Sequence, residues 1–282
     1  MALLEVKNLK KKQGEKDVLK DISFELERGE VLCVISMSDL EKATLLRCLN
    51  YLEFADGGVI TLNGETFFDE TLELKRSDKF VRKKRTQTGV VFREHNLFSH
   101  CNVLKNVMLA PMLSAKELLK KERKELRNNK NNVKTMLSQY AENKKKIYDD
   151  IANEAKEILK RMGLGNRYTE YPEKLSDGQR QRVAIARAMV MHPEVLCFDE
   201  PTGTLDMPFA GETVKVIKEL KASGQTMIIT TRNVSFAKEV SDRVMFLSDG
   251  EIVEQGKTEE MLVEPKNEPT KKFLTDSLEV KY

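Results

Sequence analysis

Apolar positions divide the chain into short strand-like runs separated by helical patterns. Three runs are almost continuously apolar, at Val31–Ile35, Val195–Phe198 and Met227–Thr230, which is typical of strands covered on both faces of a sheet. Six further strands are expected at Leu4–Leu9, Ile22–Leu26, Val59–Leu62, Gly89–Phe92, Val244–Leu247 and Glu251–Glu254. Asn63-Gly64 and Asp249-Gly250 are turn signals, and the second predicts a hairpin between two of these strands.

Helical patterns follow several of the strands. They lie at Lys42–Glu53, Gly178–Met191, Ala210–Ala222 and Phe236–Val240. Strand, loop and helix in this order predict an α/β core, in which ligand-binding loops follow the carboxyl ends of the strands.

The segment from Ser114 to Met162 differs in composition, being rich in Lys, Glu and Asn. Asn128–Asn132 is a poor helix interior and predicts a turn between two helices. One apolar helical face follows, made by Ile147, Ile151, Ala155, Ile158, Leu159 and Met162. We favour a solvated helical arm packed along this stripe. The alternative is a docking surface for a partner.

Composition limits the class of protein. At 282 residues the chain can bury the core of one large domain or two lobes. Its net charge of +3 against 33% charged residues gives no indication of nucleic-acid binding. No apolar run reaches the roughly 18–20 residues that cross a bilayer. The cysteines are scattered, which predicts small core residues of a reducing compartment: Cys33, Cys48, Cys101 and Cys197. We expect a cytoplasmic chain that only a partner would hold at a membrane.

Three ordered segments carry a family resemblance. Leu175–Ala188 reads LSDGQRQRVAIARA, and Val195–Thr202 reads VLCFDEPT and continues to Leu205-Asp206. Leu45–Asn50, LLRCLN, matches a helix that follows a phosphate loop. Together they resemble the signature segment, the Walker B strand with its D-loop, and the first helix of ATP-binding-cassette (ABC) ATPases.

Other segments resemble one subfamily, the ATP-binding subunits of polar amino-acid importers. They are Asn96–Phe98, Asn106–Pro111 and Glu264–Leu274, whereas Leu113–Ile151 is longer than that family usually carries. The resemblance implies an α/β ABC ATPase fold, with a RecA-like mixed sheet, an N-terminal antiparallel β subdomain and an inserted helical subdomain. We expect the core at 1–92 and 163–282 and the helical part at 93–162, with the signature segment 175–188 at their junction.

The resemblance also implies a mechanism and partners. In that family two subunits sandwich two ATP molecules and dock on integral-membrane permeases, at the inner face of the membrane. By position, Asp199 is the Mg²⁺ ligand and Glu200 polarises the attacking water, while Arg232 stands at the switch-histidine position. The nucleotide contacts would be Ser36, Met37, Ser38, Asp39, Leu40, Glu41, Lys42, Ala43, Thr44, Arg93, Ser176, Asp177, Gly178, Gln179 and Asp206.

The phosphate loop departs from the family pattern GxxxxGK(S/T). Ser36, Asp39 and Glu41 stand where the family has glycines, and Ala43 replaces the hydroxyl that holds Mg²⁺. A carboxylate about 4 Å from a phosphate repels it by roughly 4 kcal/mol at an effective dielectric constant near 20. Micromolar to millimolar ATP binding is worth only about 4–8 kcal/mol. Two acidic residues therefore predict weak or absent ATP binding, unless their side chains turn away.

Further departures fall on the same function. Arg93 replaces the Q-loop glutamine, Asp177 replaces the first signature glycine, and Gln13 lies where an aromatic ring normally stacks on adenine. Because the changes gather on nucleotide contacts, we favour an importer subunit with impaired or lost ATPase activity. One alternative is an active ATPase, since Lys42 and Glu200 are kept. The other is a regulatory or interaction module that uses the arm at Ser114–Met162.

The new charges suggest that the site closes on itself. We expect Arg93 and Arg232 beside Asp199 and Glu200, and Lys42 near Asp39, Glu41 and Asp199, with no nucleotide or Mg²⁺ needed to neutralise the acids. The opposing hypothesis is that both arginines bind phosphate and restore ATP binding.

Overall fold

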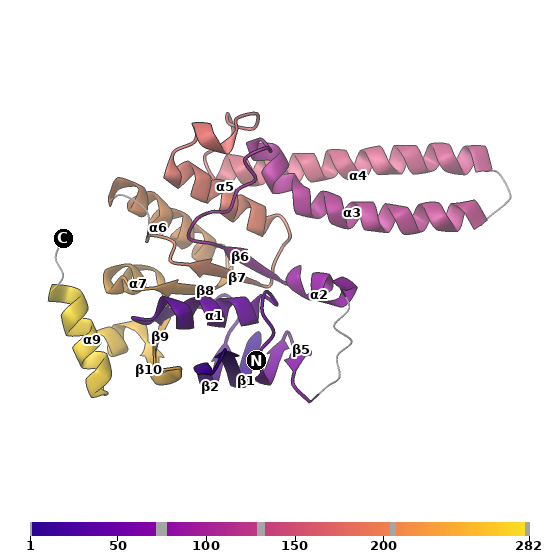
Figure 1. Cartoon of the computed structure of the whole chain (residues 1–282). Helices are drawn as coiled ribbons and strands as arrows, with labels where there is room; N and C mark the ends of the chain where they lie inside the picture. The colour runs from indigo at the N-terminus through magenta and orange to yellow at the C-terminus, as the bar shows by residue number, and fades with distance from the viewer. Residues whose placement is uncertain (1, 72–77, 129–132, 204–206, 280–282) are drawn as a thin grey trace. The chain divides into compact units, whose positions relative to one another are not determined.

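A computed structural model of the chain describes residues 2–71, 78–128, 133–203 and 207–279 (Figure 1). The chain forms two compact units. The first comprises Met1–Glu94 and Pro193–Tyr282, and the second comprises His95–His192. Residues 163–192, expected in the core from sequence, lie in this second unit, because the helix that carries the signature segment packs against the two long helices of that unit.

The first unit is built on a sheet that has ten strands in the described part of the chain, in the order β5-β4-β1-β2-β10-β9-β3-β8-β7-β6. The strands are β1 (Leu4–Gln13), β2 (Lys16–Leu26), β3 (Val31–Ile35), β4 (Gly57–Leu62), β5 (Glu65–Asp69), β6 (Thr88–Val91), β7 (Val195–Asp199), β8 (Thr226–Thr231), β9 (Arg243–Ser248) and β10 (Glu251–Lys257).

The sheet is antiparallel at one end and mostly parallel at the other. Strands β5, β4, β1 and β2 pair antiparallel, with Leu4 opposite both Leu26 and Leu62. Strands β9, β3, β8, β7 and β6 pair parallel, so their carboxyl ends lie at one edge. The β9–β10 hairpin joins the two parts through a parallel pairing of Glu251 with Asp21. This is the expected α/β mixed sheet with an antiparallel β subdomain.

The main core surrounds helix α1 (Asp39–Leu49). Leu45, Leu46 and Leu49 of α1 pack with apolar residues of the antiparallel strands and with alternate residues of the parallel strands. In β3, for example, Leu32 and Val34 belong to this cluster, whereas all five residues of the strand are buried. Burial on both faces explains the continuous apolar runs in the sequence.

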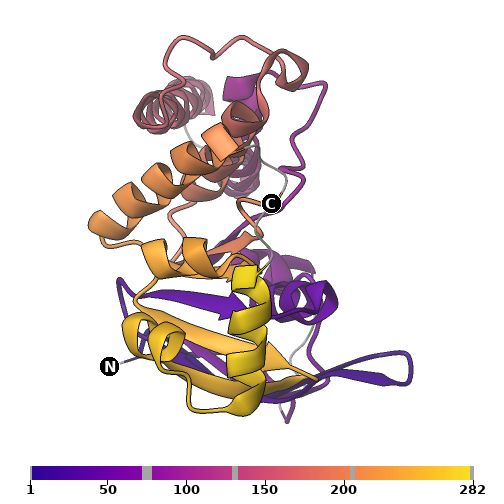
Figure 2. The same cartoon turned by 90° about the vertical axis from the view of Figure 1, so that its left-hand side faces the viewer.

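Shorter helices complete the first unit: α2 (Asp78–Arg85), α6 (Met207–Ala222), α7 (Val234–Val240), α8 (Thr258–Val263) and α9 (Glu268–Glu279). Helix α7 contacts β3, β8, α6 and α8. Helix α9, yellow in Figure 2, contacts α7 and β10, and its Phe273 stacks on Phe246 with ring centroids 4.9 Å apart.

The second unit is helical. Its elements are α3 (Val103–Asn128), α4 (Val133–Arg161), a 3₁₀ turn at Pro172–Lys174 and α5 (Asp177–Met189). Helices α3 and α4 lie side by side (Figure 1), and the amide of Asn143 donates to Glu122 across them at 3.3 Å. The predicted stripe on α4 is buried most deeply at Ala155 and Leu159. Of the predicted turn, residues 129–132 lie outside the described residues.

All nine expected strands and four expected helices are present, with ends that differ by a few residues. Sequence patterns missed β5, α2, α8 and α9, which are short or mostly polar. Within the described residues, no helix is long and apolar enough to span a membrane.

Candidate nucleotide-binding site

The first functional segment joins β3 to α1. Ser38 caps the helix, and its hydroxyl accepts a hydrogen bond from the backbone N–H of Glu41 at 3.3 Å. Ser36 is 1% exposed, and its hydroxyl accepts from the N–H of Ser38 at 3.0 Å. Two side chains of the loop point outward, because Met37 is 66% and Leu40 36% exposed. Two hydroxyl groups of this segment therefore accept hydrogen bonds from its own backbone N–H groups.

Lys42 is fully buried, and its ammonium group is already engaged. It forms an ion pair with the carboxylate of Glu200 and a second with Asp39, at 3.1 Å. Glu200 is only 8% exposed, so these two charges neutralise each other away from water. The expected pairing of Lys42 with Asp39 is present. Glu200, just after β7, is a partner that the sequence did not predict.

Asp39 is held between two cations. Its second carboxylate oxygen pairs with the guanidinium of Arg232 at 2.8 Å. Partial burial alone would raise the pKa of Asp39, but the hydrogen bond and charge of Lys42, with the charges of Arg232 and Arg93, lower it below its ordinary value. Arg232 was expected beside Asp199 and Glu200, and the structure puts its guanidinium on Asp39 instead. Only the backbone N–H of Arg232 reaches Glu200, at 3.3 Å.

The backbone of Glu200 is strained and firmly bonded. Its φ is +45°, in the left-handed region that L-residues rarely adopt. Its N–H donates to the carbonyl of Thr230 at 3.0 Å, and its own carbonyl accepts from Gly203 at 2.9 Å. Strain of this kind persists only where surrounding contacts hold it, and it often marks a functional site. The strained turn aims the Glu200 carboxylate at Lys42.

Glu41 points away from Lys42. One carboxylate oxygen accepts from the hydroxyl of Ser36 at 3.0 Å, and the other accepts from the backbone N–H of Gly250 at 3.2 Å. Gly250 has a φ of +78° at the β9–β10 turn, and a Cβ there would lie 2.9 Å from the carbonyl of Val18. The expectation that Glu41 lies beside Lys42 is therefore wrong, because the loop and the hairpin supply its hydrogen bonds.

Asp199 ends β7 beside a threonine. The hydroxyl of Thr230 donates to its carboxylate at 3.1 Å. Burial raises the pKa of Asp199, and the nearby Glu200 charge adds to this, against the opposing hydrogen bond from Thr230 and the charge of Lys42. Sequence patterns missed the role of Thr230, although its place at the end of a neighbouring strand was a usable signal.

This pKa predicts a pH-dependent effect of Asp199→Asn. Because the folded pKa is raised, the folded state binds a proton more tightly than the unfolded chain, and wild-type stability falls as pH rises from about 4 through the folded pKa. The uncharged amide of the variant does not titrate, so the variant does not lose stability in this way. The melting temperature of the variant, measured relative to that of wild type, should therefore rise as pH rises across this range. A constant difference would contradict the raised pKa.

The remaining predicted contacts of this unit lie nearby. Arg93 donates to the carbonyl of Gly203 at 3.4 Å. The side-chain amide of Gln13, at the end of β1, donates to the hydroxyl of buried Thr44 at 3.3 Å. Ala43 is half-buried on α1 and brings no hydroxyl. Asp206 lies outside the described residues.

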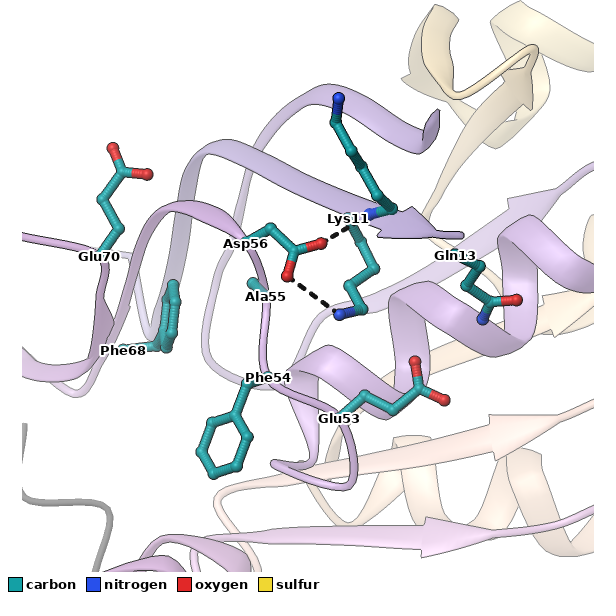
Figure 3. Close-up of a pocket in the computed structure, with 9 residues that line it drawn as sticks. Lys11, Gln13, Glu53, Phe54, Ala55, Asp56, Phe68 and Glu70 are labelled. Carbon is teal, nitrogen blue, oxygen red and sulfur yellow. Dashed lines mark hydrogen bonds and ion pairs between the residues drawn. The ribbon is translucent and has the colours of Figure 1, made fainter. Parts of the chain in front are cut away.

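A pocket of about 650 Å³ opens beside Gln13 (Figure 3). On its wall, Asp56 accepts from the ammonium of Lys11 at 3.1 Å and from the N–H of Lys12 at 2.7 Å. Its two rings, Phe54 and Phe68, lie on the side away from Gln13 in Figure 3. No ring therefore stands at the Gln13 end of this pocket, in the part of the chain that the structure describes.

The signature segment begins α5 in the second unit. Ser176 and Gln179 form a capping box, in which the Ser176 hydroxyl accepts from the Gln179 N–H and the Gln179 side chain accepts from the Ser176 N–H. Asp177 pairs with Arg180 one turn along, and Gly178 is buried. Side chains of the segment therefore satisfy the backbone N–H groups of Ser176 and Gln179 at the start of α5.

Comparison with known proteins identifies the family. The sequence model of the ABC transporter family matches residues 19–203. The chain belongs to the ABC transporter family. It is 39% identical over 272 residues to the arginine transport ATP-binding protein ArtM of Bacillus subtilis, covering 96% of this chain and 98% of ArtM. It is 38% identical to the L-cystine transport system ATP-binding protein TcyN of Escherichia coli, covering 97% and 98% of the two chains.

Solved ABC structures share the fold. The chain matches cbiO1 from Clostridium perfringens, part of the ABC transporter complex cbiONQ, with a TM-score of 0.71 at 26% identity, covering 93% of this chain and 91% of cbiO1. It matches MJ0796, a bacterial ABC transporter cassette solved as a dimer, with a TM-score of 0.68 at 26% identity, covering 90% and 98%. The ABC ATPase fold expected from the motifs is confirmed.

Proposed function

We propose that this chain is the ATP-binding subunit of an ABC importer for amino acids. It would pair with a second ABC ATPase subunit and dock on integral-membrane permeases at the inner face of the cell membrane. The proposal rests on its similarity to the arginine and cystine transport proteins, which extends over nearly the whole chain. An affinity-tagged chain should co-purify with permease subunits when expressed in its own cell, and recovery without any integral-membrane partner would contradict this assignment.

The finer part of the proposal is that binding of ATP and Mg²⁺ is impaired. The observation that carries it is the engagement of Lys42, whose ammonium would have to meet a phosphate but contacts Asp39 and Glu200. A nucleotide would need to separate a buried ion pair before gaining any contact with this lysine. Separating such a pair leaves Glu200 without a cation in a site of low exposure.

The residues also fit Mg²⁺ poorly. Ala43 brings no hydroxyl to the loop. Asp199 is already bonded to Thr230, whose hydroxyl donates to its carboxylate at 3.1 Å. Glu200 and Arg232 act here as partners in the ion pairs with Lys42 and Asp39 rather than in hydrolysis of Mg-ATP.

An active ATPase is the second candidate, since Lys42 and Glu200 are kept and both Asp39 and Arg232 have half-exposed side chains that nucleotide can reach. Steady-state phosphate release separates the two. We expect release from the purified chain to equal that of Glu200→Gln. Phosphate release that exceeds that of the variant by about a hundredfold or more, the loss expected when a group that activates water is removed, would establish the active enzyme.

A further inference from the structure

Exposed basic side chains gather at one level of the α3–α4 hairpin. We call this set the basic band: Lys116, Lys120, Lys121, Arg123 and Lys124 on α3, with Lys144, Lys145 and Lys146 on α4. The hydrogen bond from Asn143 to Glu122 joins the two helices within this stretch, so the two groups of the band lie at the same level of the hairpin.

The band is strongly positive for its size. Residues 116–124 and 142–146 hold eight basic and three acidic side chains, a net charge of +5, whereas the whole chain carries +3. One of the three acids, Glu122, is half-buried and bonded to Asn143. Lys144 lies over the ring of Tyr148 at 5.8 Å, while Lys145 and Lys146 are exposed beside it. The hairpin therefore presents a local cationic surface on a nearly neutral protein.

Two large apolar side chains lie exposed on α3 in or next to this band. Leu118 is 66% and Leu113 56% exposed, and each has a band lysine three residues later, one helical turn along. Packing between the helices does not need them, because Ala115 and Leu119 supply the buried face of α3 in this stretch. Outward leucines among lysines are typical of helices that lie on membranes, where the leucine enters the boundary between headgroups and acyl chains.

We propose that the α3–α4 hairpin binds the anionic surface of a lipid bilayer. Lysines of the basic band contact lipid phosphates and carboxylates, and Leu118, which lies within the band, enters the headgroup layer. Seven of the eight cations are lysines, which act as hydrated point charges, whereas fixed recognition of phosphate in nucleic acids or proteins favours the arginine fork. The exposed leucines also argue for lipid over nucleic acid. This contact goes beyond the proposed importer role and is independent of the nucleotide site.

The test uses the full chain and vesicle flotation. Vesicles of phosphatidylcholine alone are compared with vesicles of equal parts phosphatidylcholine and phosphatidylglycerol. We expect binding only to the anionic vesicles, weakening as salt is raised. The triple variant Lys144→Gln/Lys145→Gln/Lys146→Gln should lower the partition coefficient about hundredfold, at about fivefold for each charge lost near the surface.

A matched control removes three exposed lysines from the first unit, Lys238→Gln/Lys257→Gln/Lys272→Gln. It changes the net charge equally, and its partition should stay within about twofold of wild type, since charges beyond a Debye length of about 10 Å contribute little. Equal losses in the two triple variants would overturn the proposal. So would binding to phosphatidylcholine alone at the same strength.

Leu118→Ser separates a membrane from another polyanion. We expect it to weaken vesicle binding several-fold, because the apolar contact is lost at constant charge. Homopolymeric RNA and polyglutamate serve as competitors, and neither should displace the chain from anionic vesicles at matched charge concentration. If Leu118→Ser has no effect and either polymer displaces the chain, the band binds polyanions or acidic proteins, and the lipid proposal is wrong. Thermal melts that match wild type ensure that each variant is folded.

Discussion

Lys42→Met is expected to destabilise the protein by about 3–5 kcal/mol, because it leaves the buried carboxylate of Glu200 without its cation. The melting temperature should fall by roughly 10 °C, at about 2–4 °C for each kcal/mol in a chain of this size. Urea unfolding gives the free energy directly. The effect is large because Lys42 is fully buried and the uncharged Met cannot neutralise the acid.

A double variant isolates the ion pair. Lys42→Met/Glu200→Gln removes both charges, and we expect it to recover more than half of the lost stability, since no buried charge is left unpaired. Lys238→Met, at an exposed lysine of α7, is the matched control and should change stability by less than about 0.5 kcal/mol. If Lys42→Met has the same melting temperature as wild type, Lys42 faces solvent and is free to meet a phosphate.

Asp39→Gly is expected to raise ATP affinity by roughly a hundred- to a thousandfold. A carboxylate about 4 Å from a phosphate repels it by roughly 4 kcal/mol at an effective dielectric constant near 20, and each 1.4 kcal/mol is about tenfold in affinity. The substitution also releases Lys42 and Arg232, which Asp39 now bridges. Fluorescence titration with an ATP analogue measures the change.

Two controls define which property of Asp39 matters. Asp39→Asn keeps the side-chain size, and we expect it to give most of the gain in ATP affinity, because the charge of Asp39 rather than its bulk opposes ATP binding. Asp78→Gly removes the matching first-turn carboxylate of α2, away from the site, and should leave affinity unchanged. Should Asp39→Gly bind no better than wild type, repulsion by this carboxylate does not set the affinity.

Most of the fold could be predicted from the sequence, because burial on both faces leaves continuous apolar runs such as β3, β7 and β8. Strand β5 was missed since ETFFD is too short to show an alternating pattern. The α2 helix, DKFVRKKR, is too polar to show a buried face. Elements of this kind depend on contacts that form only in the folded chain.

The sequence indicated which residues belong to the candidate site, but it predicted only some of the ion pairs and hydrogen bonds between them. The sequence predicted Lys42 near Asp199 but did not predict its pairing with Glu200, and adjacency on one helix turn gave the Lys42–Asp39 pair. The orientation of Glu41 was missed, because it depends on Gly250, which lies 209 residues away along the chain. No local pattern carries such a contact.

The ion pairs of Lys42, Asp39, Arg232 and Glu200 are expected to keep a triphosphate out of the site. Calorimetric titration of the purified chain with Mg-ATP tests it directly. We expect no saturable heat in the micromolar range, and any binding to be weaker than about 1 mM, which corresponds to about 4 kcal/mol. A saturable isotherm with a micromolar dissociation constant would show that these ion pairs do not exclude the nucleotide.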